Sequence, residues 1–318
     1  MKIKFLSATC GIIALATMSS CSQTEVKNEN LKPIYYIPAS ASSNFVAVQT
    51  EGSEAWKYYP GIDYTLVFDE NDNTCTIQLV NLQFDEKEKA TMTFGYVPRA
   101  TFRDPMVKGV NITDPFQLSS GSTATYTISD LKVTCLLDEA RTFGTTEDDN
   151  GKVTPIKVGA QNAISFTIDN KYHVRVIQNK NYFYGTTFST SNSGDFDPFS
   201  TKKAKYCVSL DYKSNKALMT IENAKFITSM PEGITMEFPD IDFSMSDNGF
   251  TLNCRQLIPR ANNRPFQAYE VIDLVGTVTT AQTLALSFTC PHVPIPMTGT
   301  ETYSFNVSVD ANYSLTAR

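Results

Sequence analysis

The chain has few of the residues that usually build catalytic or metal sites. Its 318 residues include one tryptophan and two histidines, and neither His173 nor His292 lies in an HExxH or similar frame. This scarcity argues against zinc and against a Ser/His/Asp triad. With 27 basic residues against 33 acidic ones, the chain also lacks the positive charge that nucleic acids attract. We therefore expect no enzymatic activity, no cofactor and no nucleic-acid partner.

Cysteine is present, but not in a pattern that indicates a metal site. Two of the seven cysteines, Cys10 and Cys21, lie in the first segment. The other five are Cys75, Cys135, Cys207, Cys254 and Cys290. Their number is odd and no two have metal-ligand spacing, so we interpret them as buried free thiols in strands, with a single disulfide as the alternative.

Acidic residues gather in two short segments, DENDN (Asp69–Asn73) and EDDNG (Glu147–Gly151). Their oxygens could bind calcium, but neither segment follows the EF-hand spacing. Asp, Asn and Gly are also typical turn residues, so we expect turns here. A pair of carboxylates for glycoside hydrolysis depends on the fold, and the sequence favours no pair.

The first segment has the layout of a secretory signal. Lys2 and Lys4 precede an apolar stretch from about Phe5 to Ala16, which is too short to span a bilayer. Without these two lysines the mature chain has a formal net charge of about −8.

The end of this signal, Met18-Ser-Ser-Cys21, resembles the bacterial lipobox, in which an aliphatic and two small residues precede the lipidated cysteine. The resemblance implies a signal peptide over residues 1–20 and lipidation of Cys21, with ordinary signal-peptidase cleavage as the alternative. Ser22 stands where Asp would favour inner-membrane retention, which implies the outer membrane. Residues 21–33 are polar and predict a flexible tether.

The remaining sequence predicts an all-β fold. Thr, Val, Ile, Tyr and Phe are plentiful, and Gly, Pro, Asn and Asp interrupt short runs. Alternate residues are apolar in Tyr64, Leu66 and Phe68, which is the period of a half-buried strand. No long capped stretch has helical period. We expect antiparallel strands in barrels or sandwiches, between which the sequence does not choose.

The chain also resembles itself, which indicates a tandem duplication. Residues 64–84 align with residues 206–226, and TMTF at residues 91–94 aligns with TMEF at residues 235–238. We therefore predict one β unit over residues 34–169 and a second over residues 170–318. The copies differ at an insertion in residues 139–159 and at a polar loop in residues 186–205, where we expect specificity to lie.

The recurring strand, turn and strand ending in Asn and Phe, followed by a motif such as TMEFPDI, looks like the calycin-like and related β-rich lipoproteins of Bacteroidota. The resemblance implies a small β-barrel unit on an outer-membrane lipoprotein. It implies no functional residues.

Aromatic clusters are the remaining candidates for a binding site. Trp56, Tyr58 and Tyr59 form one cluster, and Tyr182 and Tyr184 belong to another. Exposed rings could bind sugars or a protein, whereas buried rings would be core residues.

From these observations we expect a lipid-anchored binding module without enzymatic activity, with the membrane as one partner through Cys21. Its ligand would be a glycan, a small apolar molecule or another envelope protein. A structural or adhesive surface subunit is the alternative, and a hydrolase comes third. The sequence does not indicate which face of the outer membrane carries the protein.

Overall fold

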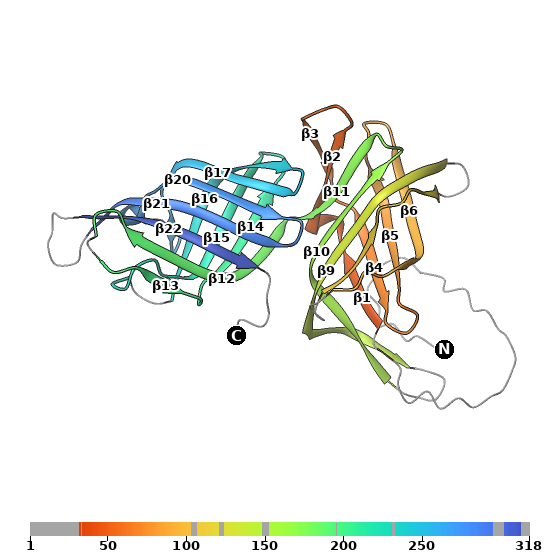
Figure 1. Ribbon diagram of the computed structural model, residues 1–318, viewed down its shortest axis with the longest axis horizontal. Coiled ribbons are helices and arrows are strands. Elements are labelled where there is room, and N and C mark those ends of the chain that lie inside the picture. Colours follow the sequence, from red (N-terminus) through yellow and green to blue (C-terminus); the bar gives the residue numbers. More distant parts are fainter. Residues whose placement is uncertain are drawn as a thin grey trace, which may run out of the picture.

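The computed structural model shows an all-β protein with two lobes, which confirms the predicted fold class (Figure 1). It describes residues 32, 34–102, 107–120, 124–147, 153–194, 196–230, 233–294 and 302–312. Side chains are described outside residues 120, 138–147 and 153–160. In the described part, no helix is long and apolar enough to cross a membrane.

The first lobe, which we call unit one, contains eleven strands and one short 3₁₀ turn. They are β1 (Ile34–Ala39), η1 (Ala41–Ser43), β2 (Asn44–Thr50), β3 (Trp56–Pro60), β4 (Asp63–Asp69), β5 (Thr74–Gln83), β6 (Lys89–Pro98), β7 (Val107–Ile112), β8 (Phe116–Ser120), β9 (Ala124–Glu147), β10 (Val153–Ile168) and β11 (Tyr172–Gln178).

The second lobe, unit two, also contains eleven strands and one 3₁₀ turn. They are β12 (Lys180–Ser191), β13 (Phe199–Thr201), β14 (Lys205–Asp211), β15 (Lys216–Ala224), β16 (Ile234–Ser246), β17 (Gly249–Leu257), β18 (Arg260–Ala261), β19 (Arg264–Pro265), η2 (Gln267–Tyr269), β20 (Val271–Thr279), β21 (Thr283–Pro294) and β22 (Thr302–Asn312).

Unit two is a closed barrel. Its strands follow the order β15-β14-β12-β22-β21-β20-β17-β16, and β16 pairs back onto β15. Closure leaves these eight strands without a free edge. The polar loop expected over residues 186–205 begins later than predicted, because residues up to Ser191 continue β12 and pair with β22.

Unit one has a related strand path, in which β1 on β4 and β2 on β11 together take the place of β12, which pairs with both β14 and β22. It is open at one point. The order is β3-β2-β11-β10-β1-β4-β5-β6, with β9 on β10 and with β7 and β8 on β9. Within the described residues, no pairing joins β6 to β7 or β8. Aromatic side chains bridge this opening instead, since the ring of Phe94 on β6 lies 6.2 Å from that of Phe116 on β8 and 5.7 Å from that of Phe166 on β10.

Strand pairing corrects the predicted boundary between the units. Residues 170–318 were expected to form unit two, but β11 pairs with β10 and β2 in the sheet of unit one. In each unit the last strand pairs with a strand near the start, β11 with β2 in unit one and β22 with β12 in unit two. The chain passes between the units after Gln178.

The two units pair their strands in the same register. Tyr64 pairs with Leu79 in unit one, and Tyr206 pairs with Ile221 at the aligned positions of unit two. The register shifts also recur at aligned positions: after Cys75 and Leu79 on β5, and after Ala217 and Ile221 on β15. Following the pairings makes these strands equivalent: β2 and β12, β4 and β14, β5 and β15, β6 and β16, β7 and β17, β9 and β20, β10 and β21, and β11 and β22.

Left-handed backbone positions match as well. Non-glycine residues with positive φ occur as the equivalent pairs Asn73 and Asn215, Asn81 and Asn223, Tyr96 and Asp240, and Asp130 and Asp273. Such a conformation is unfavourable for residues with a Cβ and is best tolerated by Asn and Asp. Its recurrence at the same turns and bulges shows that the two units share local backbone geometry as well as topology.

Both barrels have packed interiors. Alternation along each strand directs one face inward, and the inward faces of unit two bring together fully buried rings of Tyr206, Phe226, Phe238 and Phe305. Unit one has its own core with equally buried Phe68, Phe84 and Phe94.

Candidate functional site

The outer face of unit one around β2 is covered by unit two. All of the first five residues of β2 are buried, so this strand lacks the alternation of a strand with one wet face. Val46 and Val48 belong to the core of unit one, whereas Phe45 and Ala47 belong to the core cluster of unit two. The strand is therefore shared by two cores.

An aromatic cluster forms the apolar part of this junction. Phe45 stacks on Tyr212 with ring centroids 5.3 Å apart, and meets Tyr58 edge-on at 5.7 Å. Tyr58 also contacts Phe243, at 5.9 Å. Burial raises the pKa of Tyr58, and a hydrogen bond with the backbone of Met245 partly opposes that rise.

Arg175 forms the polar part of the junction. Its guanidinium donates to three backbone carbonyls of the β16–β17 hairpin, those of Ser246, Asp247 and Gly249. The same guanidinium lies over the ring of Trp56, 4.7 Å from its centroid. A planar group with five donors can satisfy several acceptors while stacking, which lysine cannot do.

A buried amide pair adds a second polar link. Gln161 donates to the side-chain oxygen of Gln282, and the backbone N–H of Tyr182 donates to Gln161 Oε1 at 2.9 Å. Both glutamines are buried, so the amide nitrogen of Gln161 and the amide oxygen of Gln282 depend on each other for this hydrogen bond.

Between these links lies a cleft of 490 Å³. Its wall on unit one is the outer face of β9, β10, β11 and β2, and its other wall is made by the β16–β17 and β20–β21 turns. The polar side chains on these walls include Gln49, Asp130, Lys132, Ser165, Thr167, His173, Asp247, Asn248, Thr280 and Gln282, and Trp56 lies at one side. Ligand sites are often found at such contacts between domains.

His173 is held in a short polar chain within the cleft. Thr167 Oγ1 lies 3.0 Å from His173 Nδ1, and Glu51 Oε2 lies 2.8 Å from His173 Nε2. The three residues have the connectivity of a hydrolytic triad. However, Thr167 is only 6 % exposed, so a substrate would not reach its hydroxyl. The arrangement orients the imidazole.

The five aromatic residues predicted as ligand contacts lie in three places. Trp56 and Tyr58 face unit two at the junction, where Arg175 already covers one face of the Trp56 ring. Tyr59, on the opposite face of β3, belongs to the core of unit one. Tyr182 and Tyr184 point outward from β12, because Phe183 between them is fully buried, and Lys205 lies 5.1 Å from the Tyr182 ring. Cys21 lies outside the described residues.

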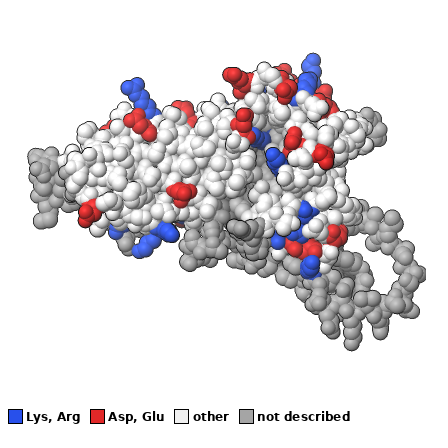
Figure 2. Space-filling view, in the orientation of Figure 1, with Lys and Arg blue, Asp and Glu red and all other residues white. Residues whose placement is uncertain are grey.

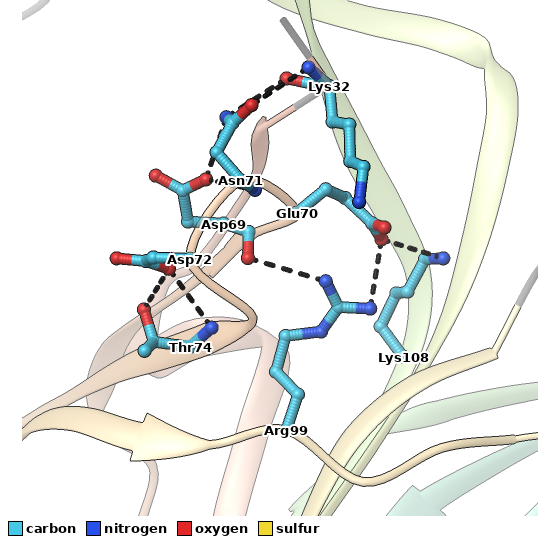
Figure 3. A network of polar contacts seen from close by, with 8 residues as sticks. All are labelled: Lys32, Asp69, Glu70, Asn71, Asp72, Thr74, Arg99 and Lys108. Atoms are coloured by element: carbon cyan, nitrogen blue, oxygen red, sulfur yellow. Dashed lines mark hydrogen bonds and ion pairs between the residues drawn. The ribbon is translucent and has the colours of Figure 1, made fainter.

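The acidic DENDN turn is satisfied by its own surroundings (Figure 3). Asp69 accepts hydrogen bonds from the backbone and side chain of Asn71, and Asp72 accepts them from the backbone and hydroxyl of Thr74. Among the described residues, no group of three or more His, Cys, Asp or Glu is placed to hold a metal ion.

Glu70 of the same turn binds two cations (Figure 3). Its Oε1 lies 2.9 Å from Arg99 Nη2 and 2.9 Å from Lys108 Nζ. Burial would raise the pKa of Glu70, but the hydrogen bonds from Lys108 and Arg99 outweigh it and lower the pKa. The acidic cluster is therefore part of an ion network.

All five described cysteines are free thiols, and all but Cys254 are buried. Burial raises the pKa of Cys75 to about 12 and raises that of Cys135 and Cys290 further. A thiol with a raised pKa is a poor nucleophile and a poor metal ligand. These cysteines fill the core.

The fold thus defines a class of all-β proteins with two similar barrel-like units. No protein-family model and no curated protein matches the chain. Among solved structures, one similar chain is the isotype 1 transferrin binding protein B from serogroup B Neisseria meningitidis, with 10 % identity and a TM-score of 0.24. The match covers 88 % of this chain and 76 % of that one. A likeness at this TM-score does not bear on function.

Proposed function

We propose that the protein is a non-enzymatic binding lipoprotein of the outer membrane that holds a segment of a neutral glycan in the cleft between its two units. The observation that carries this proposal is the cleft itself, with uncharged hydrogen-bonding side chains on both walls. Its charged groups are mixed: Asp130 and Asp247 accompany Lys132 and Arg175. A ligand with many hydroxyls and no net charge suits this lining.

The packed interiors argue against the small apolar ligand that the sequence left open. A barrel that holds such a ligand needs an internal cavity. In unit two the space is filled by large side chains such as Phe226, Phe238 and Phe288, whose rings pack edge to face at 5.4 Å.

The cleft can be tested by filling it. In Ser165→Tyr a larger side chain occupies the wall of the cleft, and Lys132→Ala removes an exposed amino group there. We expect both variants to lose at least about tenfold in affinity for the neutral polysaccharides that the purified full chain retains on an array. Lys213→Ala, at an exposed turn outside the cleft, is the matched control. Unchanged binding by Ser165→Tyr would exclude the cleft as the site.

The anchor is the second part of the proposal. Lipidation of Cys21 would attach the protein to the membrane through the tether, and Ser22 would direct it to the outer membrane. We expect Cys21→Ser to abolish incorporation of labelled palmitate in cells and to release the protein from the membrane fraction. Cys10→Ser, in the same signal, should leave labelling unchanged. Palmitate incorporation into Cys21→Ser would refute this anchor.

We further propose that the units arose by tandem duplication. Shared registers, shared register shifts and four equivalent left-handed positions support this origin better than the sequence match alone.

A further inference from the structure

Unit two carries an exposed counterpart of the face that unit one uses in the cleft. This counterpart is the outer face of β12, β22, β21 and β20, and strand pairing makes its positions equivalent to those of β2, β11, β10 and β9. The equivalent pairs are Ala47 and Phe188, Gln49 and Thr190, Asp130 and Asp273, Ser165 and Ser287, Thr167 and Thr289, His173 and Asn306, and Arg175 and Ser308.

This face has lost the residues that would dock another unit. Thr186 stands at the position of Phe45, Asp310 at that of Ile177, and Ser308 at that of Arg175. A second barrel would find neither the apolar contact nor the guanidinium that holds unit two on unit one. At these positions the face is therefore polar and suited to contact with solvent.

Phe188 departs from this trend. Where unit one has the small Ala47, unit two has an aromatic ring that is 41 % exposed. An exposed ring on a rigid strand costs solvation free energy, and nothing in the described part of the barrel covers it. Such a ring offers a flat apolar surface to a ligand.

Phe188 borders a depression of 280 Å³. The polar side chains around it are Thr190, Asp273, Ser287, Thr289, Asn306 and Ser308. This lining contains one carboxylate and no basic residue, which disfavours an anionic ligand. Few charged side chains interrupt the visible surface of unit two (Figure 2).

Two of these groups are held in place. Thr289 donates to Asn306 Oδ1 at 2.8 Å, so the amide nitrogen of Asn306 is turned toward other acceptors. Asp273 sits at a register shift of β20 with a φ of 53°, which fixes its position beside the neighbouring strand. The site combines an apolar ring, an oriented donor and a carboxylate acceptor.

We propose that this depression binds one uncharged sugar ring of a glycan, with the C–H face of the sugar on Phe188 and its hydroxyls on Asp273 and Asn306. The inference rests on the proposed glycan-binding function and adds a second site on unit two, separate from the cleft. The two sites would engage one polysaccharide together and increase its retention by avidity.

The test measures binding of the purified full chain to neutral oligosaccharides by calorimetry. We expect Phe188→Ala and Asp273→Asn each to weaken binding at the second site by about tenfold. Leu218→Ala, which removes a 37 % exposed apolar side chain from β15 of the same barrel, is the matched control and should change nothing. Circular dichroism would verify that each variant is folded.

The cleft variant Ser165→Tyr separates this inference from the proposed function. Binding that is weakened but not abolished in Ser165→Tyr, and is lost when Phe188→Ala is added, supports two sites. Binding that is unchanged in Ser165→Tyr and lost in Phe188→Ala overturns the cleft and leaves the second site. Loss in Ser165→Tyr with no effect of Phe188→Ala overturns the second site and leaves the cleft. Absence of neutral-sugar binding by the natural protein overturns both. If Phe188→Ala instead abolishes capture of an envelope protein, the sugar site is also overturned.

Discussion

The two units use equivalent positions for opposite purposes. In unit one, Glu70, Arg99 and Lys108 form an ion network at the β4–β5 end of the barrel. The equivalent residues of unit two are Tyr212, Phe243 and Phe250, and the first two of these rings pack against unit one. One barrel end carries a charged network whose members satisfy each other, and the other is aromatic because a second unit covers it.

Each unit is thus adapted to its place in a chain of two. Phe45 and Ile177 of unit one pack against unit two, whereas Thr186 and Asp310 stand at the equivalent positions of unit two. A polar outer face is also typical of the terminal units of repeat proteins. The contacts that hold unit two on unit one therefore have no counterparts on the equivalent face of unit two. This difference between the two units can be tested with variants at equivalent positions.

The largest expected effect comes from the paired core residues Phe84 and Phe226. Both are buried, and both contact other rings at 5.4 to 5.6 Å. Phe84→Ala and Phe226→Ala should each destabilise the protein by about 3–5 kcal/mol in chemical denaturation. If the units unfold separately, each variant should shift its own transition. A shift of both transitions by either variant would show that the junction makes the units one cooperative body.

Arg175→Ala is expected to have the next largest effect. It leaves carbonyls of the β16–β17 hairpin without their charged donor, at a cost of about 2–3 kcal/mol. Limited proteolysis should then cut more readily between the units, while Arg175→Lys should restore little because it cannot replace the planar fork. Ser308→Ala, at the equivalent position of unit two, is the control. Equal effects of the two alanine variants would contradict the asymmetry.

Equivalent left-handed residues should give smaller and equal effects. Asn81→Ala and Asn223→Ala should each cost about 1 kcal/mol, because alanine lacks the side-chain amide whose local hydrogen bonding lets asparagine tolerate the left-handed conformation. Asn81→Gly and Asn223→Gly should be tolerated. Thermal unfolding measures the stability of all four variants. If Asn81→Ala and Asn223→Ala lose different amounts of stability, the two bulges are not equivalent.

The smallest expected effect is pH-dependent and confined to unit one. The lowered pKa of Glu70 means that its ion network stabilises the folded state above the ordinary pKa of 4.5 and is lost as pH falls through the lowered value. Glu70→Gln should flatten this part of the pH–stability profile, and Glu54→Gln, at an exposed loop, should not. An unchanged profile in Glu70→Gln would show that the network adds no stability.

The sequence predicted the strands well because alternation is a local signal. Tyr64, Leu66 and Phe68 lie inward as predicted, and the fold class is confirmed. The boundary at residue 170 was wrong because the place of β11 depends on its pairing with β2, which is distant in the chain.

The cleft could not be predicted, because its walls come from strands and turns of both units. One signal was available: the continuous apolar run from Phe45 to Val48 is typical of a strand buried on both faces. The sequence does not indicate that unit two covers the second face of this strand. No local sequence pattern indicates that Arg175 binds the β16–β17 hairpin.

The pairing of β2 with β11, and of β12 with β22, has a consequence for how each barrel folds. Gln49 in β2 pairs with His173 in β11, so unit one cannot complete its sheet until nearly all of its chain is available for pairing. Such non-local pairing gives a high contact order and slow folding. On the export route proposed above, Cys75 and Cys135 would meet an oxidising compartment during that interval, and chaperones that delay disulfide formation would then raise the yield of folded protein.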